Sequence, residues 1–233
     1  MQIFRTDRPL APSYDLIRPS IRLIRENIWA VLYLNFFPNL LLIVGLVLAS
    51  SITDQNPPIT HYDTRTSLGL ALAFAGALWA LLAYPGLILL QIKAAAGEHP
   101  TPMACFKQGL PRLLPLIFMS ILAVLLVMLG FIALIIPGLI LIRGFYLAPY
   151  YIVEQNIGPV EALKKCFADS KPNAGYIWGV IGVTIGFAAM SSFVGRVPVA
   201  GYMLSLLVGL VYLFAPVLRY TEIAKNLPIR LVD

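Results

Sequence analysis

Four polar side chains, Arg143, Tyr146, Tyr150 and Glu154, follow one another at steps of three, four and four residues in an otherwise apolar stretch. This spacing places them on one face of a helix, where they form a polar stripe. Arginine suits a planar, bidentate hold on phosphate or carboxylate, so the stripe contains the candidate ligand-binding residues. Arg143 and Glu154 lie about 16 Å apart along an ideal helix and therefore cannot pair with each other.

Two interpretations of the stripe remain open. In the first, Arg143 extends to the outer lipid headgroups and Glu154 lies at the inner membrane interface. In the second, the stripe faces the interior of a helix bundle, where it lines a polar cavity or ties helices together. A charge at the bilayer centre costs about 2.5–3.5 kcal/mol on insertion scales, so we expect the guanidinium to have a partner or a ligand.

Three further residues in apolar stretches are candidates for structural roles. Pro149 falls within the stripe, frees the carbonyl of Phe145 and predicts a kink in the helix. Asn35 and Asn39 stand four residues apart around Pro38 in another apolar stretch. Asparagines in such positions commonly bond neighbouring helices, each worth roughly 0.6 kcal/mol.

Other chemistry-bearing patterns are missing from the sequence. His61 and His99 fall in loops on opposite sides of the predicted membrane, and Asp54 and Asp63 share the outer loop with His61, where solvent surrounds them. The chain has no His-x-x-x-His, Cys-x-x-Cys, Gly-x-Ser-x-Gly or Walker glycine loop. We therefore predict no catalytic residue, no metal site and no cofactor.

The elements that position these residues follow from composition. The 233 residues are 59% hydrophobic and 12% charged, with a mean hydropathy of +0.83. Soluble domains contain about 25% charged residues, about twice the fraction in this chain. We therefore expect most of the chain to be surrounded by lipid. Its long charge-poor runs predict an all-α polytopic bundle of six transmembrane helices. The six predicted helices cover 27–51, 67–92, 113–135, 138–156, 174–195 and 198–221.

The distribution of basic residues predicts the orientation of the bundle. Fourteen Lys and Arg residues fall on the side that holds both termini, two fall on the other side, and Arg143 lies within the membrane. The positive-inside rule then places both termini in the cytoplasm. The net charge of +6 suits an anionic membrane leaflet, and the chain has no basic patch with interleaved aromatic residues that would indicate nucleic acid.

Three cytoplasmic segments resemble one another. They begin at Ser13, Pro102 and Pro159, have apolar residues at their second, fifth and ninth positions, a basic residue at the sixth and a small residue at the eighth. This pattern predicts short amphipathic helices at the membrane interface over 14–26, 103–110 and 160–170, with Ile17, Phe106 and Leu163 central in the apolar faces. Pro19 and Pro111 interrupt the pattern.

The chain is predicted to form one membrane domain. Residues 1–26 form the amphipathic N-terminal segment, 27–221 the bundle in three hairpin units, and 222–233 the cytoplasmic tail. Cys105 and Cys166 fall on the cytoplasmic side, where we expect them to pack as small residues, with palmitoylation as the alternative.

One region resembles a known family. Pro137-Gly138, Arg143, Pro149, Glu154 and Ala162-Leu163, with a small residue at 166, are similar to a group of six-helix prokaryotic membrane proteins. This group includes the YciC-like proteins and the membrane domain sometimes fused to glycerophosphoryl diester phosphodiesterases. The resemblance covers about 35 residues, and it departs from the family at Cys166, where serine is frequent. It implies a six-helix membrane fold, and no soluble phosphodiesterase domain is present here.

Two functions fit these observations. The first is a non-enzymatic protein of the cytoplasmic membrane that acts as a scaffold or in envelope maintenance, with lipids, other membrane proteins or itself as partners. The second is a transporter or lipid-handling protein for an anionic small molecule or lipid headgroup. A polar cavity around Arg143 would favour the second function, and an apolar interior closed around it would favour the first.

Overall fold

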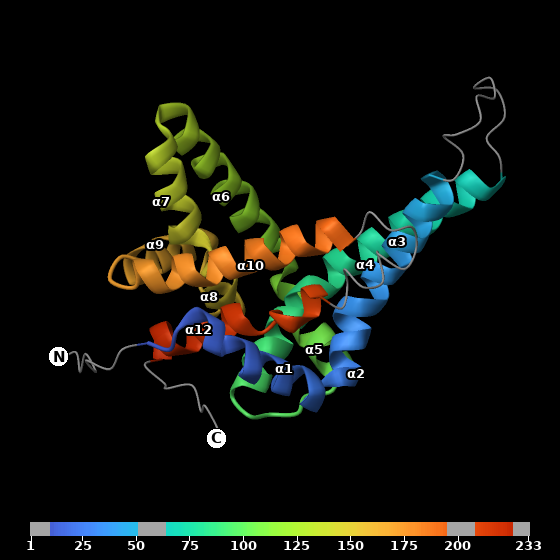
Figure 1. Ribbon diagram of the computed structural model, residues 1–233, viewed down its shortest axis with the longest axis horizontal. Helices are drawn as coiled ribbons and strands as arrows, with labels where there is room; N and C mark the ends of the chain where they lie inside the picture. Colours follow the sequence, from blue (N-terminus) through green and yellow to red (C-terminus); the bar gives the residue numbers. More distant parts are fainter. Residues whose placement is uncertain (1–9, 51–63, 195–207, 226–233) are drawn as a thin grey trace.

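The computed structural model describes residues 10–50, 64–194 and 208–225, and every regular element within these ranges is helical (Figure 1). The predicted all-α class is confirmed. In chain order the elements are η1 (Ser13–Leu16), α1 (Ile17–Glu26), α2 (Ile28–Val31), η2 (Leu32–Phe36), α3 (Phe37–Ser50), α4 (Thr64–Ala95), α5 (Pro102–Gly109), η3 (Leu110–Arg112), α6 (Leu113–Ala133), α7 (Ile135–Phe145), α8 (Ala148–Gln155), α9 (Pro159–Ser170), α10 (Ala174–Val194) and α12 (Ala215–Lys225).

Four helical runs of the described residues are long and apolar enough to cross a membrane. They cover Ile28–Ala49, Thr66–Ala95, Pro102–Ala133 and Ile135–Gln155, and a fifth is added if α9 and α10, bent by 107° at their junction, count as one span. These runs agree with a multi-pass membrane protein.

Two of the predicted spans are present but are less regular than a single α-helix. The first consists of α2, the π-helical turn η2 and α3, where a single helix over 27–51 was predicted. The fourth was predicted as one kinked helix over 138–156, but it breaks into α7 and α8 around residues 146–147. The predicted kink at Pro149 thus corresponds to a two-residue turn at 146–147, just before Pro149 in the first turn of α8, and Ile135–Gln155 as a whole is still long and apolar enough to form one span.

The predicted sixth span differs from the structure in its described part. Residues 195–207 lie outside the described ranges. The rest is not one helix, because a turn at residues 212–214 separates the helical residues 208–211 from α12, which continues to Lys225. The sequence prediction placed one helix over 198–221 because apolar residues run through this turn without a charge.

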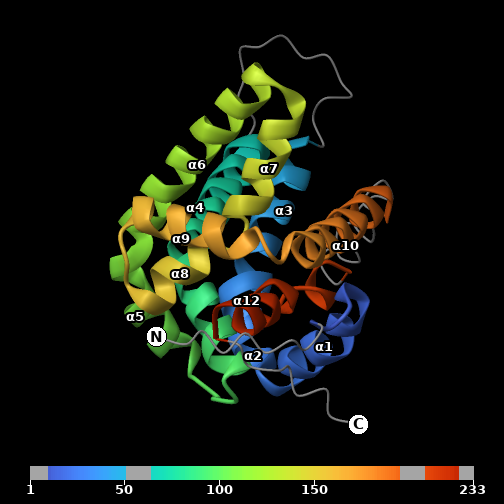
Figure 2. The same cartoon turned by 90° about the vertical axis from the view of Figure 1, so that its left-hand side faces the viewer.

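Two helical hairpins, α3–α4 and α6–α7, rise from a common base and diverge (Figure 1). In the first hairpin glycines bring the backbones together: a Cβ added to Gly45 would lie 2.3 Å from the backbone nitrogen of Ala73, and one on Gly76 would lie 2.5 Å from that of Leu42. Such close approach is typical of membrane helices, whose association depends on van der Waals packing. α10 leaves α9 steeply and runs across the base instead of along a hairpin (Figure 2).

The core of the molecule lies in the base. Near its C-terminal end α4 is buried on all sides over residues 85–92, and the helix contacts η2, α5, α8 and α12. A helix that is apolar all round is stable only when other elements surround it. The two hairpins, in contrast, expose large apolar side chains such as Phe74, Ile132 and Ile136, as expected of surfaces that face lipid.

The three segments predicted to be amphipathic are helical, as η1 and α1, α5, and α9. The predicted central residue Leu163 is buried, whereas Ile17 and Phe106 are half-buried. The small residue at the eighth position is buried in all three: Ser20, Gly109 and Cys166. Several of the surrounding apolar residues remain exposed. α5 also continues through η3 into α6 without a non-helical residue, so it is not separate from the predicted third span.

Candidate functional site

Three of the four stripe residues contact other helices. The Tyr146 hydroxyl lies 3.2 Å from Thr184 Oγ1 on α10. The buried Tyr150 hydroxyl donates to Gln91 Oε1 on α4 at 2.9 Å. Glu154 accepts a hydrogen bond from the Tyr220 hydroxyl of α12 and pairs with Lys225. The structure thus brings Tyr146, Tyr150 and Glu154 into contacts that tie helices together.

Arg143 differs from the other three. It is half-buried in the last turn of α7, and in the described part of the chain its Nε is buried without a hydrogen-bond partner. Because α7 ends at Phe145, its last carbonyls carry partial negative charge, which favours a cation in this turn. The break before Pro149 therefore gives a physical reason for an arginine in this apolar stretch.

The asparagine pair is satisfied within its own span. Asn39 Nδ2 donates to the backbone carbonyl of Asn35 at 2.6 Å and lies 3.3 Å from its Oδ1. Asn35 belongs to the π-helical turn η2, where the wider helical repeat alters the backbone hydrogen bonding. The bonds found here thus run along the helix, where bonds to neighbouring helices were expected.

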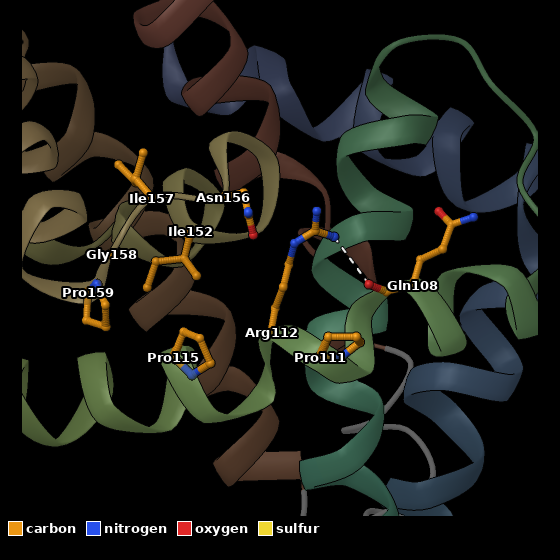
Figure 3. Close-up of a pocket in the computed structure, with 9 residues that line it drawn as sticks. All are labelled: Gln108, Pro111, Arg112, Pro115, Ile152, Asn156, Ile157, Gly158 and Pro159. Carbon is orange, nitrogen blue, oxygen red and sulfur yellow. Dashed lines mark hydrogen bonds between the residues drawn. The ribbon is translucent and has the colours of Figure 1, made fainter.

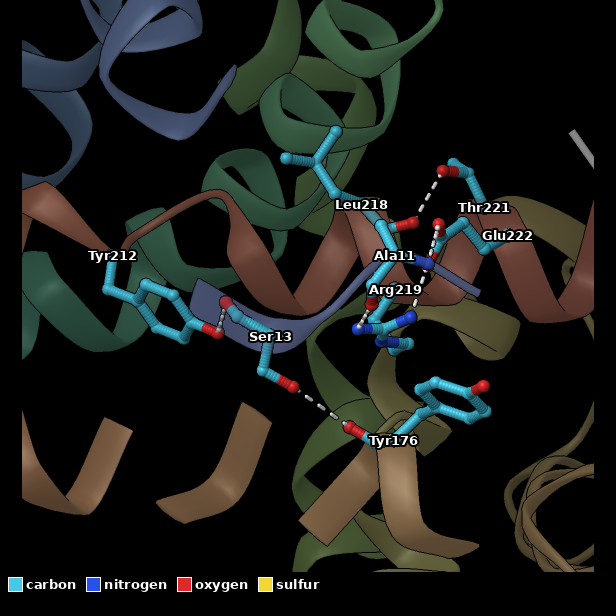
Figure 4. Close-up of polar contacts among 8 residues, drawn as sticks. All are labelled: Ala11, Ser13, Tyr176, Tyr212, Leu218, Arg219, Thr221 and Glu222. Carbon is cyan, nitrogen blue, oxygen red and sulfur yellow. Dashed lines mark hydrogen bonds and ion pairs between the residues drawn. The ribbon is translucent and has the colours of Figure 1, made fainter. Parts of the chain in front are cut away.

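A second polar cluster, which the sequence analysis did not identify, is centred on Arg219 (Figure 4). The side chain of Arg219 is fully buried, and it pairs with Glu222 one turn later in α12. Its Nη2 donates to the Ala11 carbonyl at 2.7 Å, and the Ala11 N–H donates to Glu222 Oε1 at 3.3 Å. The guanidinium also lies over the ring of Tyr176, 5.3 Å from its centroid.

Additional hydrogen bonds extend this cluster along the N-terminal segment. The Tyr212 hydroxyl donates to the Ser13 carbonyl at 2.8 Å, and Ser13 Oγ donates to the Tyr176 carbonyl at 3.4 Å. The backbone N–H of Phe214 donates to Ser20 Oγ at 3.2 Å. The cluster therefore fastens η1 and α1 to α10 and α12, which are distant in the sequence.

The sequence analysis counted Arg219 only among the fourteen basic residues on the side of the termini. Its place in the fold is the interior of the base, where the carboxylate of Glu222 balances its charge. A local signal was available: Arg219 and Glu222 stand three residues apart, and apolar residues flank the arginine. Burial of Glu222 raises the pKa of its carboxyl above the ordinary value, although Arg219 opposes this shift.

The ring of Tyr220 links the stripe to a wider polar layer. It stacks on Tyr150 at 5.5 Å and meets Tyr151 edge-on at 4.9 Å between centroids. Tyr151 donates to Asp169 Oδ2 on α9 at 2.6 Å, and Gln155 Nε2 donates to the Tyr220 hydroxyl at 3.2 Å. This layer connects α4, α8, α9 and α12, and it satisfies polar groups that would be expensive to leave unpaired.

The remaining candidate residues are the two cysteines and the two histidines. Cys105 and Cys166 are both buried as free thiols, which agrees with packing and leaves neither accessible for palmitoylation. His99 is exposed, and His61 lies outside the described residues. Within the ranges that the structure describes, no three His, Cys, Asp or Glu residues are grouped so that they could hold a metal ion.

Comparison with known proteins finds no matching family model, no matching curated protein and no matching solved structure.

Proposed function

We propose that the chain is a non-enzymatic, multi-pass protein of the cytoplasmic membrane that acts as a scaffold or in maintenance of the cell envelope. The observation that carries this proposal is the use of the polar stripe. Tyr146, Tyr150 and Glu154 are engaged in contacts between helices, with α10, α4 and α12 respectively. Polar groups used in this way hold a bundle together, whereas those of a transport path face water.

The proposed topology has six crossings with both termini in the cytoplasm. The four apolar runs supply four crossings, and we assign the fifth and sixth to the predicted spans 174–195 and 198–221, of which residues 195–207 lie outside the described ranges. The two hairpins rise from one side of the base, while α1, α5 and α12 lie in the base, which supports a common side for the basic segments (Figure 1). Exposed apolar residues at repeat positions, including Tyr14, Met103 and Val160, support an interfacial placement of the three amphipathic segments.

A second candidate function is transport or handling of an anionic small molecule or lipid headgroup. The observation that favours it is the buried Nε of Arg143, which has no partner in the described residues. We also propose that the chain is related to the YciC-like membrane proteins, because it shares Pro137, Arg143 and Glu154 with their pattern.

The scaffold proposal is tested by complementation of a deletion strain. Loss of the gene should raise the sensitivity of cells to detergent, and the wild-type chain should restore resistance. A Tyr150→Phe/Glu154→Gln variant, which loses its bonds to α4 and α12, should restore less. Glu161→Gln, which removes an exposed carboxylate of α9, is the matched control.

Transport would be measured separately, in vesicles that contain the purified chain. Uptake of labelled organic anions that is lost in Arg143→Leu would contradict the scaffold function and support the second candidate. Unaltered detergent resistance in the deletion strain would also contradict the scaffold function.

A further inference from the structure

An open cavity of about 370 Å³ lies at the foot of the α6–α7 hairpin (Figure 3). Its walls come from two places in the chain: the run from the end of α5 through η3 to the start of α6, and the second half of α8 with the loop to α9. The volume falls within the range of small-molecule pockets, about 300–1,000 Å³. Among the nine described residues that line it, Arg112 alone carries a charge. An occupant that this cavity selects by charge must therefore be anionic.

Arg112 has unused hydrogen-bonding capacity. A guanidinium has five N–H donors. Nη1 of Arg112 donates to the Gln108 carbonyl at 3.3 Å, whereas its Nε is buried without a partner among the described residues. The side chain of Gln108 is directed elsewhere, because its Oε1 accepts from Lys93 at 2.9 Å. The ion pairs found in the described ranges do not include Arg112, so no carboxylate neutralises it there.

The opposite wall adds further donors. α9 begins beside the cavity with Gly158 and Pro159, and no side chain caps its first turn. The unpaired N–H groups of a helix start favour an anion. Glu161 in this turn is exposed and does not line the cavity. Figure 3 shows the guanidinium of Arg112 between the Gln108 carbonyl and the loop that carries Asn156.

The surface next to the cavity is suited to lipid chains. Leu114, Phe118, Ile121 and Leu125 follow one another at steps of four, three and four residues in α6, and each is more than half exposed. They form one apolar helix face that begins two residues after Arg112 and continues along the hairpin. A lipid whose phosphate lay in the cavity would place its acyl chains along this face.

We propose that this cavity binds the phosphate group of an anionic membrane phospholipid, with Arg112 as the principal donor. The guanidinium holds the phosphate oxygens through charge-assisted hydrogen bonds, for which its planar fork is better suited than an ammonium group. The start of α9 faces the same group, and the apolar face of α6 contacts the acyl chains. This site goes beyond the scaffold function and does not depend on it.

The proposal is tested with the purified full chain in neutral detergent micelles. Native mass spectrometry would measure binding of phosphatidylglycerol and of phosphatidylcholine, and thermal unfolding would measure the stabilisation by each lipid. We expect wild-type protein to prefer phosphatidylglycerol. Arg112→Gln should bind it at least about tenfold more weakly, and Arg112→Lys should recover part of the loss.

A second variant tests the cavity without a change of charge. A Cβ at Gly158 would meet no atom within 4 Å, so Gly158→Leu introduces a side chain into open space beside the site. It should also weaken binding of phosphatidylglycerol. Lys107→Gln, which removes an exposed charge from α5, is the matched control and should bind like wild type. The unfolding temperature without added lipid reports whether each variant is folded.

Three results would overturn the proposal. One is equal binding by wild type and Arg112→Gln. Another is an equal loss in Arg112→Gln and Lys107→Gln, which would indicate general attraction between a basic surface and an anionic lipid. The third is stabilisation by inorganic phosphate alone that depends on Arg112 and is as large as that by the lipid, which would assign the cavity to free phosphate.

Discussion

At the scale of single residues, the fully buried guanidinium of Arg219 shows how charge is accommodated inside the base. It pairs with Glu222 in the same helix and donates to the Ala11 carbonyl, and this hydrogen bond fastens the first described residues to α12. Removing one member of a buried pair leaves an uncompensated charge, whereas an exposed pair contributes little to stability. The chain contains an exposed pair for comparison, Arg22 and Glu26, at 2.9 Å.

Replacing Glu222 with Gln should lower the free energy of unfolding by about 1–3 kcal/mol at neutral pH, because the buried hydrogen bonds that its carboxylate accepts from Arg219 and from the Ala11 N–H are weakened or lost. Glu26→Gln should change it by less than about 1 kcal/mol. Thermal and denaturant unfolding in detergent would measure both variants. A similar small loss in the two would show that the buried pair does not hold the base together.

The same carboxyl predicts a pH dependence. Burial raises the pKa of Glu222 above its ordinary value of 4.5, so the folded state binds this proton more tightly than the unfolded state does. As the pH falls through the raised pKa, wild type should therefore gain stability relative to Glu222→Gln. The gain should level off below about 4.5, where both states are protonated. Unfolding of the two proteins across the acidic range measures the difference, and a relative loss with falling pH would contradict the raised pKa.

Arg143 should stabilise the end of α7 through its charge. Replacing it with Leu removes the cation from the last turn, and we expect a loss of about 0.3–2 kcal/mol in detergent, while Arg143→Lys should lie close to wild type. Unfolding temperatures of the three proteins would measure the effect. If Arg143→Leu were as stable as the wild-type protein, the charge of Arg143 would not stabilise the end of α7.

At the scale of elements, close backbone contact holds the α3–α4 hairpin together. A new Cβ at Gly45 would lie 2.3 Å from a backbone atom of α4, and backbone cannot move aside as the end of a flexible side chain can. The exposed glycines of α10 differ, because a Cβ at Gly182 or Gly186 would meet no atom within 4 Å. Glycine therefore has a packing function in the first hairpin, and no contact in the described residues requires it at these two positions of α10.

Gly45→Ala should lower stability by about 1–3 kcal/mol through overpacking. Gly186→Ala, the matched control, should be neutral or stabilising by up to about 1 kcal/mol, since alanine is the better helix former. Unfolding in detergent distinguishes the two. If Gly45→Ala were as stable as Gly186→Ala, the helices would have room to separate and the close contact would not be required.

At the scale of the whole molecule, the two apolar hairpins and the buried polar base have different surroundings. The hairpins expose large apolar side chains, and the base contains the ion pairs and the tyrosine layer. This division is expected of a protein whose hairpins lie in lipid and whose base lies at a membrane–water interface.

Reporter fusions test the proposed topology. A reporter joined at Asp63, which lies outside the described residues, should score as external, and one joined after Lys225 should score as cytoplasmic. The physical reason is the concentration of basic residues on the side of the termini. A third fusion in the α5 region, at Lys107, is the control and should agree with Lys225. Identical scores at Asp63 and Lys225 would exclude the six-crossing arrangement.

The sequence by itself determined the local features of this protein. Long apolar runs identified the membrane class and the approximate positions of the helices from α3 to α10, because hydropathy and helix length depend on neighbouring residues only. Pro149 predicted the interruption of the fourth span for a similar reason, since the missing N–H acts on the carbonyl four residues earlier. The stripe was also visible, because helical spacing alone places its members on one face.

The tertiary structure alone decided which of these groups are partners. Ala11 and Arg219 are separated by 208 positions, and Tyr150 and Gln91 by 59, so no local pattern relates them. The sequence identified Ser20 and Gly109 only as the small residues at the eighth position of the repeat. In the structure both are buried where elements meet. Arg219 was counted only as one of the basic residues on the side of the termini, and nothing local indicated its distant partners. Its burial becomes stable only when packing brings a carboxylate, a carbonyl and an aromatic ring around it.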